Sequence, residues 1–291
     1  MIDMTDLCLG RRPRRPAITE GMNERVWLIT GASSGFGRAL AQAVLDRGDT
    51  VVAAVRDPAA LDDMPGVSTV RLDVTEQARI TSAVAETLDR HGRIDVLVNN
   101  AGRALFGAVE ETTDAELRAL MDLHFFGPAA LVRAVLPHMR ERGSGTIVQM
   151  SSMGGQLSFA GVGPYSATKA ALEGLSEALA EEVAPHGIGV LIVEPGAFRT
   201  GLFGDRLAQA AETDPYAGTV GKARATALAA DGRQPGDPAK AAAAILAALD
   251  GDTPLRLPLG NDAVDALTAH ADSVRRELLA WEDVARGTDF D

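Results

Sequence analysis

The sequence is poor in cysteine and in basic charge. Cys8 is the only cysteine among 291 residues, which excludes an internal disulfide and a thiolate metal cluster and favours a reducing cytoplasm. The five histidines share no close metal-ligand spacing, so we expect no metal site. The net charge of −12 argues against a nucleic-acid partner. No apolar run approaches the roughly 20 residues of a membrane helix, so we expect no membrane partner.

The first 22 residues differ in composition from the rest. MIDMTDLCLGRRPRRPAITEGM is rich in arginine and proline, and no apolar segment follows RRPRR as an export signal would require. This composition is typical of a disordered chain. We therefore predict a disordered leader at 1–22, with Met22 as an alternative start.

Short apolar runs from Val26 onward predict seven buried strands. These runs are VWLIT (26–30), TVVAAV (50–55), STVRLDV (68–74), IDVLVNN (94–100), GTIVQMSS (145–152), IGVLIVEPG (188–196) and LRLPLG (255–260). Segments with helical spacing lie between several of them, at 37–48, 76–92, 114–143 and 164–187. We expect Gly127-Pro128 to bend the third of these helices.

This alternation indicates the fold class. Strands that are apolar on both faces and alternate with helices form a parallel sheet covered on both sides. The chain shows no linker and no internal repeat, so 23–291 is predicted to be a single doubly wound, Rossmann-type α/β domain with a seven-stranded parallel sheet. The stretch 201–235 interrupts the alternation after a strand end, where such sheets bind ligands. It is therefore a candidate substrate lid.

A glycine-rich turn joins the first strand to the first helix. In TGASSGFG (30–37), Gly31, Gly35 and Gly37 allow a sharp turn and let a phosphate approach the helix N-terminus. The spacing is G-x-x-x-G-x-G rather than G-x-G-x-x-G. Its place in a βαβ unit nevertheless favours phosphate binding over a purely structural turn.

The end of the second strand bears on the choice of dinucleotide. NAD enzymes usually place an acid there for the ribose 2′-hydroxyl, whereas an arginine suits the 2′-phosphate of NADP. Here the strand ends Val55-Arg56-Asp57-Pro58. We predict NADP(H) over NAD(H). Two alternatives stay open. Arg56 is a solvated charge in a loop, or Asp57 is the acid that binds the ribose 2′-hydroxyl rather than an ordinary turn residue.

One of only two tyrosines lies a helical turn before a lysine. In PYSATKAALEG (164–174), Tyr165 and Lys169 share a helix face. A phenol with a reference pKa near 10 must lose roughly 2 to 3 units to shuttle a proton near neutral pH. An adjacent ammonium stabilises the phenolate and so favours that change, as would the positive ring of an oxidised nicotinamide. The alternative is a partly buried tyrosine beside a solvated lysine.

Five motifs occur together in one order, which is far more specific than any of them alone. They are TGASSGFG at 30–37, NNAG at 99–102, a serine thirteen residues before the tyrosine (Ser152), YSATK at 165–169 and PGAFRT at 195–200. Over about 24–260 the chain resembles the short-chain dehydrogenase/reductase family in its single-domain form.

The resemblance implies roles for the matching positions. Tyr165 would be the general acid in reduction and the base in oxidation, and Ser152 would hydrogen-bond the substrate carbonyl. Lys169 would bind the nicotinamide ribose and lower the tyrosine pKa. Asp73 would lie against the adenine and Thr200 against the nicotinamide carboxamide. The full set of implied cofactor contacts, besides Tyr165 and Lys169, is Gly31, Ser33, Ser34, Gly35, Phe36, Gly37, Arg56, Asp73, Val74, Asn99, Ala101, Gly102, Pro195, Gly196 and Thr200.

One position departs from the family pattern. The family carries an asparagine in N-x-x-G after the fourth strand, where it helps hold a water in the proton relay to the lysine. Here MDLHFFGP puts His124 at that position. An imidazole can donate and accept, so His124 is a candidate substitute in the relay. Packing beside the Gly127-Pro128 bend and an impaired relay are the alternatives.

We therefore predict an enzyme that interconverts a hydroxyl and a carbonyl group of a small molecule by hydride transfer, using Ser152, Tyr165 and Lys169. The alternative from another class is an NADPH-binding regulatory or sensor protein with weak catalysis, motivated by His124. Epimerisation or dehydration on the same scaffold is less favoured.

The resemblance also implies a homodimer or homotetramer. The substrate is not specified by the sequence. Apolar side chains in the insert suit an apolar or amphipathic substrate, and they equally suit a satellite core: Leu202, Phe203, Leu207 and Tyr216.

Overall fold

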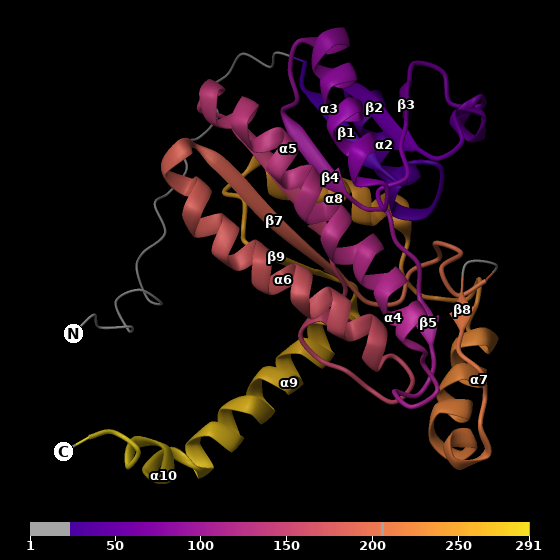
Figure 1. Cartoon of the computed structure of the whole chain (residues 1–291), viewed down its shortest axis with the longest axis vertical. Helices are drawn as coiled ribbons and strands as arrows, with labels where there is room; N and C mark the ends of the chain where they lie inside the picture. The colour runs from indigo at the N-terminus through magenta and orange to yellow at the C-terminus, as the bar shows by residue number, and fades with distance from the viewer. Residues whose placement is uncertain (1–23, 205–206, 291) are drawn as a thin grey trace.

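A seven-stranded parallel sheet forms the centre of the molecule (Figure 1). The computed structural model describes residues 24–204 and 207–290, so the predicted leader at 1–22 lies outside the described residues. The strand order is β3-β2-β1-β4-β6-β7-β9, and every neighbouring pair is parallel. The strands are β1 (Val26–Thr30), β2 (Thr50–Val55), β3 (Ser68–Arg71), β4 (Val96–Asn99), β6 (Gly145–Met150), β7 (Ile188–Pro195) and β9 (Arg256–Leu259).

Helices cover both faces of the sheet, as the two-sided apolar strands predict. Helices α2 (Gly35–Asp46) and α8 (Pro238–Asp250) pack into one buried apolar core. Helices α3 (Gln77–His91), α5 (Gly127–Arg142) and α6 (Gly163–Val183) pack into a second core on the other face. The doubly wound fold and all seven predicted strands are confirmed.

The long helix predicted at 114–143 is interrupted by one wider turn. Helix α4 (Asp114–Met121) passes into a π-turn at Asp122–Phe126, and α5 starts at Gly127. A Cβ at Gly127 would collide with the carbonyl oxygen of Val74, so glycine lets the helix approach the end of the sheet. The irregularity expected at Gly127-Pro128 therefore lies in the preceding turn. Such π-turns often occur at functional sites.

One helix among the described residues is long and apolar enough to cross a membrane by length and composition. It is the continuous segment Asp114–Arg142, with a mean hydropathy of 1.4 over its most apolar window and 44% of that window buried. Its inner side packs against the sheet and α3, and a core helix of this kind passes the same test.

The insert at 201–235 forms a flap beside the carboxyl edge of the sheet (Figure 1). Its strand β8 (Ala208–Gln209) pairs with β5 (Leu105–Phe106), and it continues into α7 (Lys222–Ala229). The buried carboxylate of Glu111 accepts hydrogen bonds from the backbone N–H and the hydroxyl of Thr213, at 2.7 and 2.9 Å. These contacts attach the flap to the segment that follows β5.

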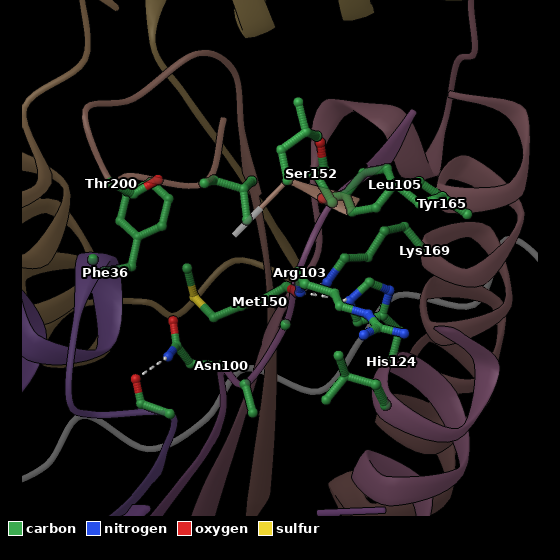
Figure 2. A pocket seen from close by; sticks show the side chains of 18 of the residues that line it. Phe36, Asn100, Arg103, Leu105, His124, Met150, Ser152, Tyr165, Lys169 and Thr200 are labelled. Carbon is green, nitrogen blue, oxygen red and sulfur yellow. Dashed lines mark hydrogen bonds between the residues drawn. The ribbon is translucent and has the colours of Figure 1, made fainter. Parts of the chain in front are cut away.

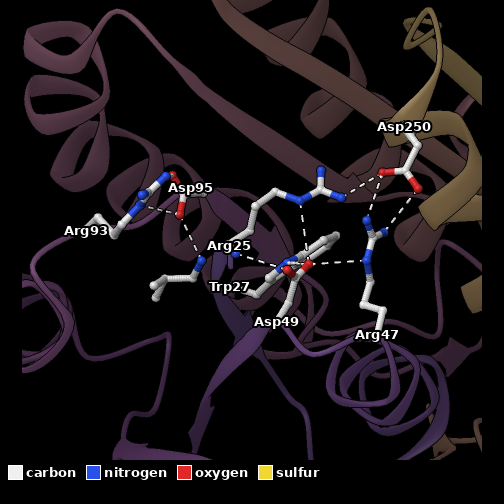
Figure 3. Close-up of polar contacts among 8 residues, drawn as sticks. Arg25, Trp27, Arg47, Asp49, Arg93, Asp95 and Asp250 are labelled. Carbon is white, nitrogen blue, oxygen red and sulfur yellow. Dashed lines mark hydrogen bonds and ion pairs between the residues drawn. The ribbon is translucent and has the colours of Figure 1, made fainter. Parts of the chain in front are cut away.

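Ion pairs close the opposite, amino-terminal edge of the sheet (Figure 3). The carboxylate of Asp49 accepts from the indole of Trp27 at 3.0 Å and from the backbone N–H of Arg25 at 3.0 Å. Arg25 and Arg47 both donate to Asp250 at the end of α8. These contacts tie together the edge of the sheet opposite the functional motifs.

Two helices at the C-terminal end were not predicted. Helix α9 (Asn261–Ala280) leaves the body and continues into α10 (Glu282–Arg286) (Figure 1). Only Ala263 of α9 is buried, so packing against the domain fixes little more than its first turn.

Candidate active site

A cavity of about 1220 Å³ opens at the carboxyl ends of β1 and β4, where the strand order reverses. Open α/β sheets bind ligands at this switch point. The cavity exceeds the roughly 300–1,000 Å³ of a typical ligand site, so it has room for a dinucleotide and a second molecule. Most of the predicted site residues line it: Gly31, Ser33, Ser34, Gly35, Phe36, Arg56, Asp73, Val74, Ala101, Gly102, His124, Ser152, Tyr165, Lys169, Pro195, Gly196 and Thr200.

The glycine turn has the form that an anion site needs. Gly31 and Gly35 have φ values of 65° and 55°, which side chains disfavour, and a Cβ at Gly31 would lie 2.9 Å from Cα of Ala101. Ser34, the N-cap of α2, makes no side-chain cap hydrogen bond, and the first turn holds no acidic residue. The N-terminus of α2 is therefore suited to the phosphates of a dinucleotide.

Thr30 and Asn100, which were not predicted as site residues, hold this turn against the end of β4. The hydroxyl of Thr30 accepts hydrogen bonds from the N–H groups of Asn100 and Ala101, at 2.9 and 3.0 Å. The side-chain amide of Asn100 donates to the carbonyl oxygens of Thr30 and Gly31, at 2.8 and 3.2 Å. Thr30 is the first residue of TGASSGFG and Asn100 the second of NNAG, so the motifs contain both supporting residues.

Two residues predicted to contact the cofactor do not line the cavity. Asn99 is buried within the sheet, where its amide donates to the side chain of Gln149 at 2.9 Å, and Asn100 lines the cavity in its place. Gly37 packs inside the turn, where a Cβ would collide with the carbonyl oxygen of Gly31. Asn99 therefore supports the sheet and Gly37 supports the turn, and neither lines the cavity as predicted.

At the end of β2, the arginine and the acid have different surroundings. Arg56 is exposed and lines the cavity. Asp57 is not among the lining residues, and its carboxylate caps the short helix Pro58–Leu61 by accepting from the N–H of Ala59 at 3.1 Å. Asp57 is thus the turn residue that the Asp-Pro pair suggested.

Ser152, Tyr165 and Lys169 converge on one wall of the cavity (Figure 2). Ser152 follows β6, and its hydroxyl accepts from the N–H of Gly154 at 3.1 Å. Tyr165 and Lys169 lie in the first two turns of α6, and the ammonium is 5.8 Å from the centre of the phenol ring. The ammonium also donates to the carbonyl oxygen of Met150 at 2.7 Å. A carbonyl group could therefore meet a hydroxyl, a phenol and a cation in one place.

The charge states of this pair differ from the expectation. Burial raises the pKa of Tyr165 to about 12, although the hydrogen bond with Ser152 lowers it. Burial also lowers the pKa of Lys169 to about 8. In the protein without cofactor, burial is thus the largest influence on the phenol, and it acts against the fall in pKa that proton transfer near neutral pH requires. Further positive charge beside the phenol would be needed to bring its pKa down.

His124 lies in the π-turn beneath the tyrosine, and both of its ring nitrogens are engaged. The backbone N–H of Arg103 donates to Nε2 at 3.2 Å. Nδ1 lies 2.8 Å from the hydroxyl of Thr168, which itself donates to the carbonyl oxygen of Tyr165. Nδ1 therefore carries the proton. Burial, followed by the charges of Lys169 and Arg103, lowers the pKa of His124 well below its ordinary value, so the ring is neutral.

We predict that His124→Asn retains kcat within about threefold, because an amide can also donate and accept. His124→Phe should lower kcat by about tenfold or more and lower the melting temperature, because the Arg103 N–H loses its hydrogen-bond acceptor and the Thr168 hydroxyl loses its contact with the ring. Thermal melts and pH profiles of kcat for both variants check this. An inflection on the acidic side of the wild-type profile that disappears in His124→Asn would instead favour the relay role.

The far end of the cavity is apolar. Leu202, Phe203 and Leu207 of the insert line it, together with Leu105, Phe106, Phe159 and Val162. Tyr216 does not line it and instead donates to the carboxylate of Glu110. Within the described ranges, no group of histidine, cysteine and acidic side chains is arranged to hold a metal ion.

The fold and the position of the cavity define a Rossmann-type α/β protein with a ligand site at the switch point of its sheet. The family model for short chain dehydrogenases matches residues 25–211. The chain belongs to that family, and it is an oxidoreductase that acts on CH–OH or C=O groups.

Three known proteins illustrate the similarity. A crystal structure of a short-chain dehydrogenase from Streptomyces avermitilis is 61% identical, with a TM-score of 0.87 over 92% of this chain and 100% of that one. A short-chain dehydrogenase from Burkholderia cenocepacia in complex with NADP is 27% identical, with a TM-score of 0.71 over 90% and 98% of the two chains. A 3-ketodihydrosphingosine reductase of Bacteroides thetaiotaomicron is 42% identical over 185 residues, 64% of this chain and 68% of that protein.

Proposed function

We propose that the protein is an NADP(H)-preferring oxidoreductase that interconverts a hydroxyl and a carbonyl group with Ser152, Tyr165 and Lys169. The observation that carries the proposal is the convergence of these three side chains in the cavity that begins at the N-terminus of α2. The similar enzyme that was crystallised with NADP supports a nicotinamide cofactor.

Each of the three side chains has a distinct part in the reduction. A bound nicotinamide would supply the hydride. Ser152 donates a hydrogen bond to the carbonyl oxygen of the substrate, and Tyr165 gives it the proton. The ammonium of Lys169 stabilises the phenolate that remains, and oxidation runs through the same groups in reverse.

The apolar end of the cavity supports a substrate with an apolar or amphipathic body. Leu202, Phe203 and Leu207 face it from the insert, and the ring of Phe203 meets that of Phe106 at 6.1 Å between centres. Such a wall favours alkyl or aromatic groups over sugars or phosphorylated compounds.

Arg56 is the residue expected to set the cofactor preference. It lines the cavity at the end of β2, and the neighbouring acid Asp57 is occupied as a helix cap. We expect NADPH to bind more tightly than NADH, and Arg56→Asp to weaken NADPH binding by about 10- to 100-fold and reverse the preference. Titrations that follow nicotinamide fluorescence measure both affinities.

The matched control is Arg90→Asp, which makes the same charge change on α3 outside the cavity and should leave both affinities unchanged. Binding of neither nucleotide would refute the proposed function. Tight NADPH binding without turnover across a broad panel of carbonyl compounds and alcohols would favour a regulatory or sensor protein instead.

A further inference from the structure

A charge cluster, formed by the buried carboxylates of Glu173 and Glu194 and by the half-buried Arg256, lies next to the catalytic serine loop but outside the cavity. Glu173 comes from α6, Glu194 from β7 and Arg256 from β9, and the two carboxylates are 3% and 1% exposed. Arg256 donates to both carboxylates, at 2.7 Å to Glu173. Two carboxylates buried at one arginine are costly to maintain, and the reaction as described does not use them.

Glu173 contacts the loop that carries the catalytic serine. Its Oε1 accepts a hydrogen bond from the hydroxyl of Ser151, the residue before Ser152. The same loop passes so close that a Cβ at Gly155 would collide with this carboxylate. Only a glycine at Gly155 permits this approach, so the loop is built around the side chain of Glu173.

Glu173 also lies one helical turn after Lys169, on the same face of α6. Burial lowers the pKa of Lys169 to about 8, and the negative charge of Glu173 opposes that shift. Glu173 likewise contributes to the raised pKa of Tyr165, after burial. The same carboxylate therefore acts on both titrating groups of the proposed mechanism.

The other charged groups around this region are accounted for. Arg256 and Glu194 face Glu173 from the adjacent strands, and Glu177 shares Arg256 at 2.7 Å on the exposed side of α6. His124 faces Lys169 from the π-turn and is neutral. Glu173 is thus the buried carboxylate that follows the lysine on its own helix.

We propose that Glu173 is a positioning residue, which holds the serine loop through Ser151 and keeps the ammonium of Lys169 charged. The inference rests on the proposed function, because it assigns the chemistry to Ser152, Tyr165 and Lys169. Glu177 binds the same arginine without touching the loop, so it provides a matched comparison.

The chain is well suited to a direct test by NMR. It has three lysines, and Lys222 and Lys240 are both exposed, so only Lys169 is buried. Protein labelled with ¹³C at lysine therefore reports one buried ammonium and two internal references. The experiment titrates wild type, Glu173→Gln and Glu177→Gln without nucleotide, and then records pH profiles of kcat for alcohol oxidation.

Removal of the charge should lower the midpoint of Lys169 by about one pH unit in Glu173→Gln. In Glu177→Gln the midpoint should stay within about 0.2 units, because an exposed charge is screened. The kcat profile of Glu173→Gln should also lose activity at a lower pH on its basic side, because Lys169 there gives up the charge that stabilises the phenolate of Tyr165. A midpoint that is unchanged in folded Glu173→Gln, or that moves equally in Glu177→Gln, overturns the proposal.

A second variant covers the case in which Glu173→Gln does not fold because Arg256 loses a buried partner. The paired change Glu173→Gln/Arg256→Gln replaces the ion pair with two neutral amides, and it should still lower the midpoint of Lys169. An unchanged midpoint there also overturns the proposal. Because the titrations need neither cofactor nor substrate, their outcome is separate from any failure of the proposed function.

Discussion

Tyr165→Phe should abolish turnover while the protein stays folded and binds the dinucleotide. The change removes one hydroxyl, which is the only phenol that lines the cavity in the described part of the chain. Positioned proton transfer contributes roughly 10²- to 10⁴-fold, so kcat should fall by about that factor. Steady-state kinetics in both directions, with nucleotide binding measured on the same sample, check the result.

The second tyrosine provides the control. Tyr216→Phe removes an equivalent hydroxyl that lies outside the cavity and bonds to Glu110, and kcat should change by no more than about twofold. If Tyr165→Phe keeps more than about a tenth of the wild-type kcat, the tyrosine is not the proton donor and the proposed mechanism is wrong.

The fold was predictable because its signals are local. Each strand is a short run that is apolar on both faces, and this pattern requires cover on both sides. The strand-to-helix positions of TGASSGFG and NNAG then fixed where the cavity opens. The order of the motifs also predicted that Ser152, Tyr165 and Lys169 lie together. Ser152 follows β6, and Tyr165 and Lys169 lie at the start of α6, the helix between β6 and β7.

The features that were missed depend on contacts between distant segments. Asn99 and Asn100 are the same residue type, and contacts with distant segments separate them: Asn99 bonds to Gln149 of β6, and Asn100 bonds to Thr30 at the end of β1. The cluster at Glu173 joins a helix to β7 and β9, and no local pattern marks it. The fall expected for the pKa of Tyr165 considered the positive charges beside the phenol, whereas the extent of its burial is a property of the folded molecule.

Helices in the C-terminal half were missed for a different reason. Helix α7 is rich in alanine, and Arg224 is its only buried residue. Its sequence therefore lacks the periodic large apolar side chains that predict an amphipathic helix. Helix α9 has apolar side chains that remain exposed, including Val274, Leu278 and Trp281 at the junction with α10. A sequence pattern indicates that a helix has an apolar side but not whether the domain covers it.

Lys169→Met should separate catalysis from stability. The ammonium is 5% exposed, so the variant loses the cation that stabilises the phenolate, and kcat should fall by about 10²-fold or more. The pKa of Lys169 falls from 10.5 to about 8 on folding, which corresponds to a cost of about 3 kcal/mol for keeping the folded protein charged at pH 7. Methionine removes that cost and fills similar space.

The net gain in stability should be smaller than this cost. The carbonyl oxygen of Met150 loses its hydrogen bond from the ammonium, which offsets about 1 to 3 kcal/mol. We therefore expect Lys169→Met to be more stable than wild type by about 1 kcal/mol at pH 7, or roughly 2 °C in Tm. Urea and thermal denaturation of the two proteins measure the difference.

The pH dependence gives the sign of the effect. Below pH 8 the lysine is protonated in both folded and unfolded wild type, so the full cost applies. Between about pH 8 and 10.5 the unfolded chain binds more protons than the folded one, and wild-type stability therefore rises with pH. Lys169→Met lacks this rise, so its advantage should shrink across that range. A variant that is less stable than wild type at pH 7 and keeps the same slope above pH 8 would show that the buried ammonium carries no such cost.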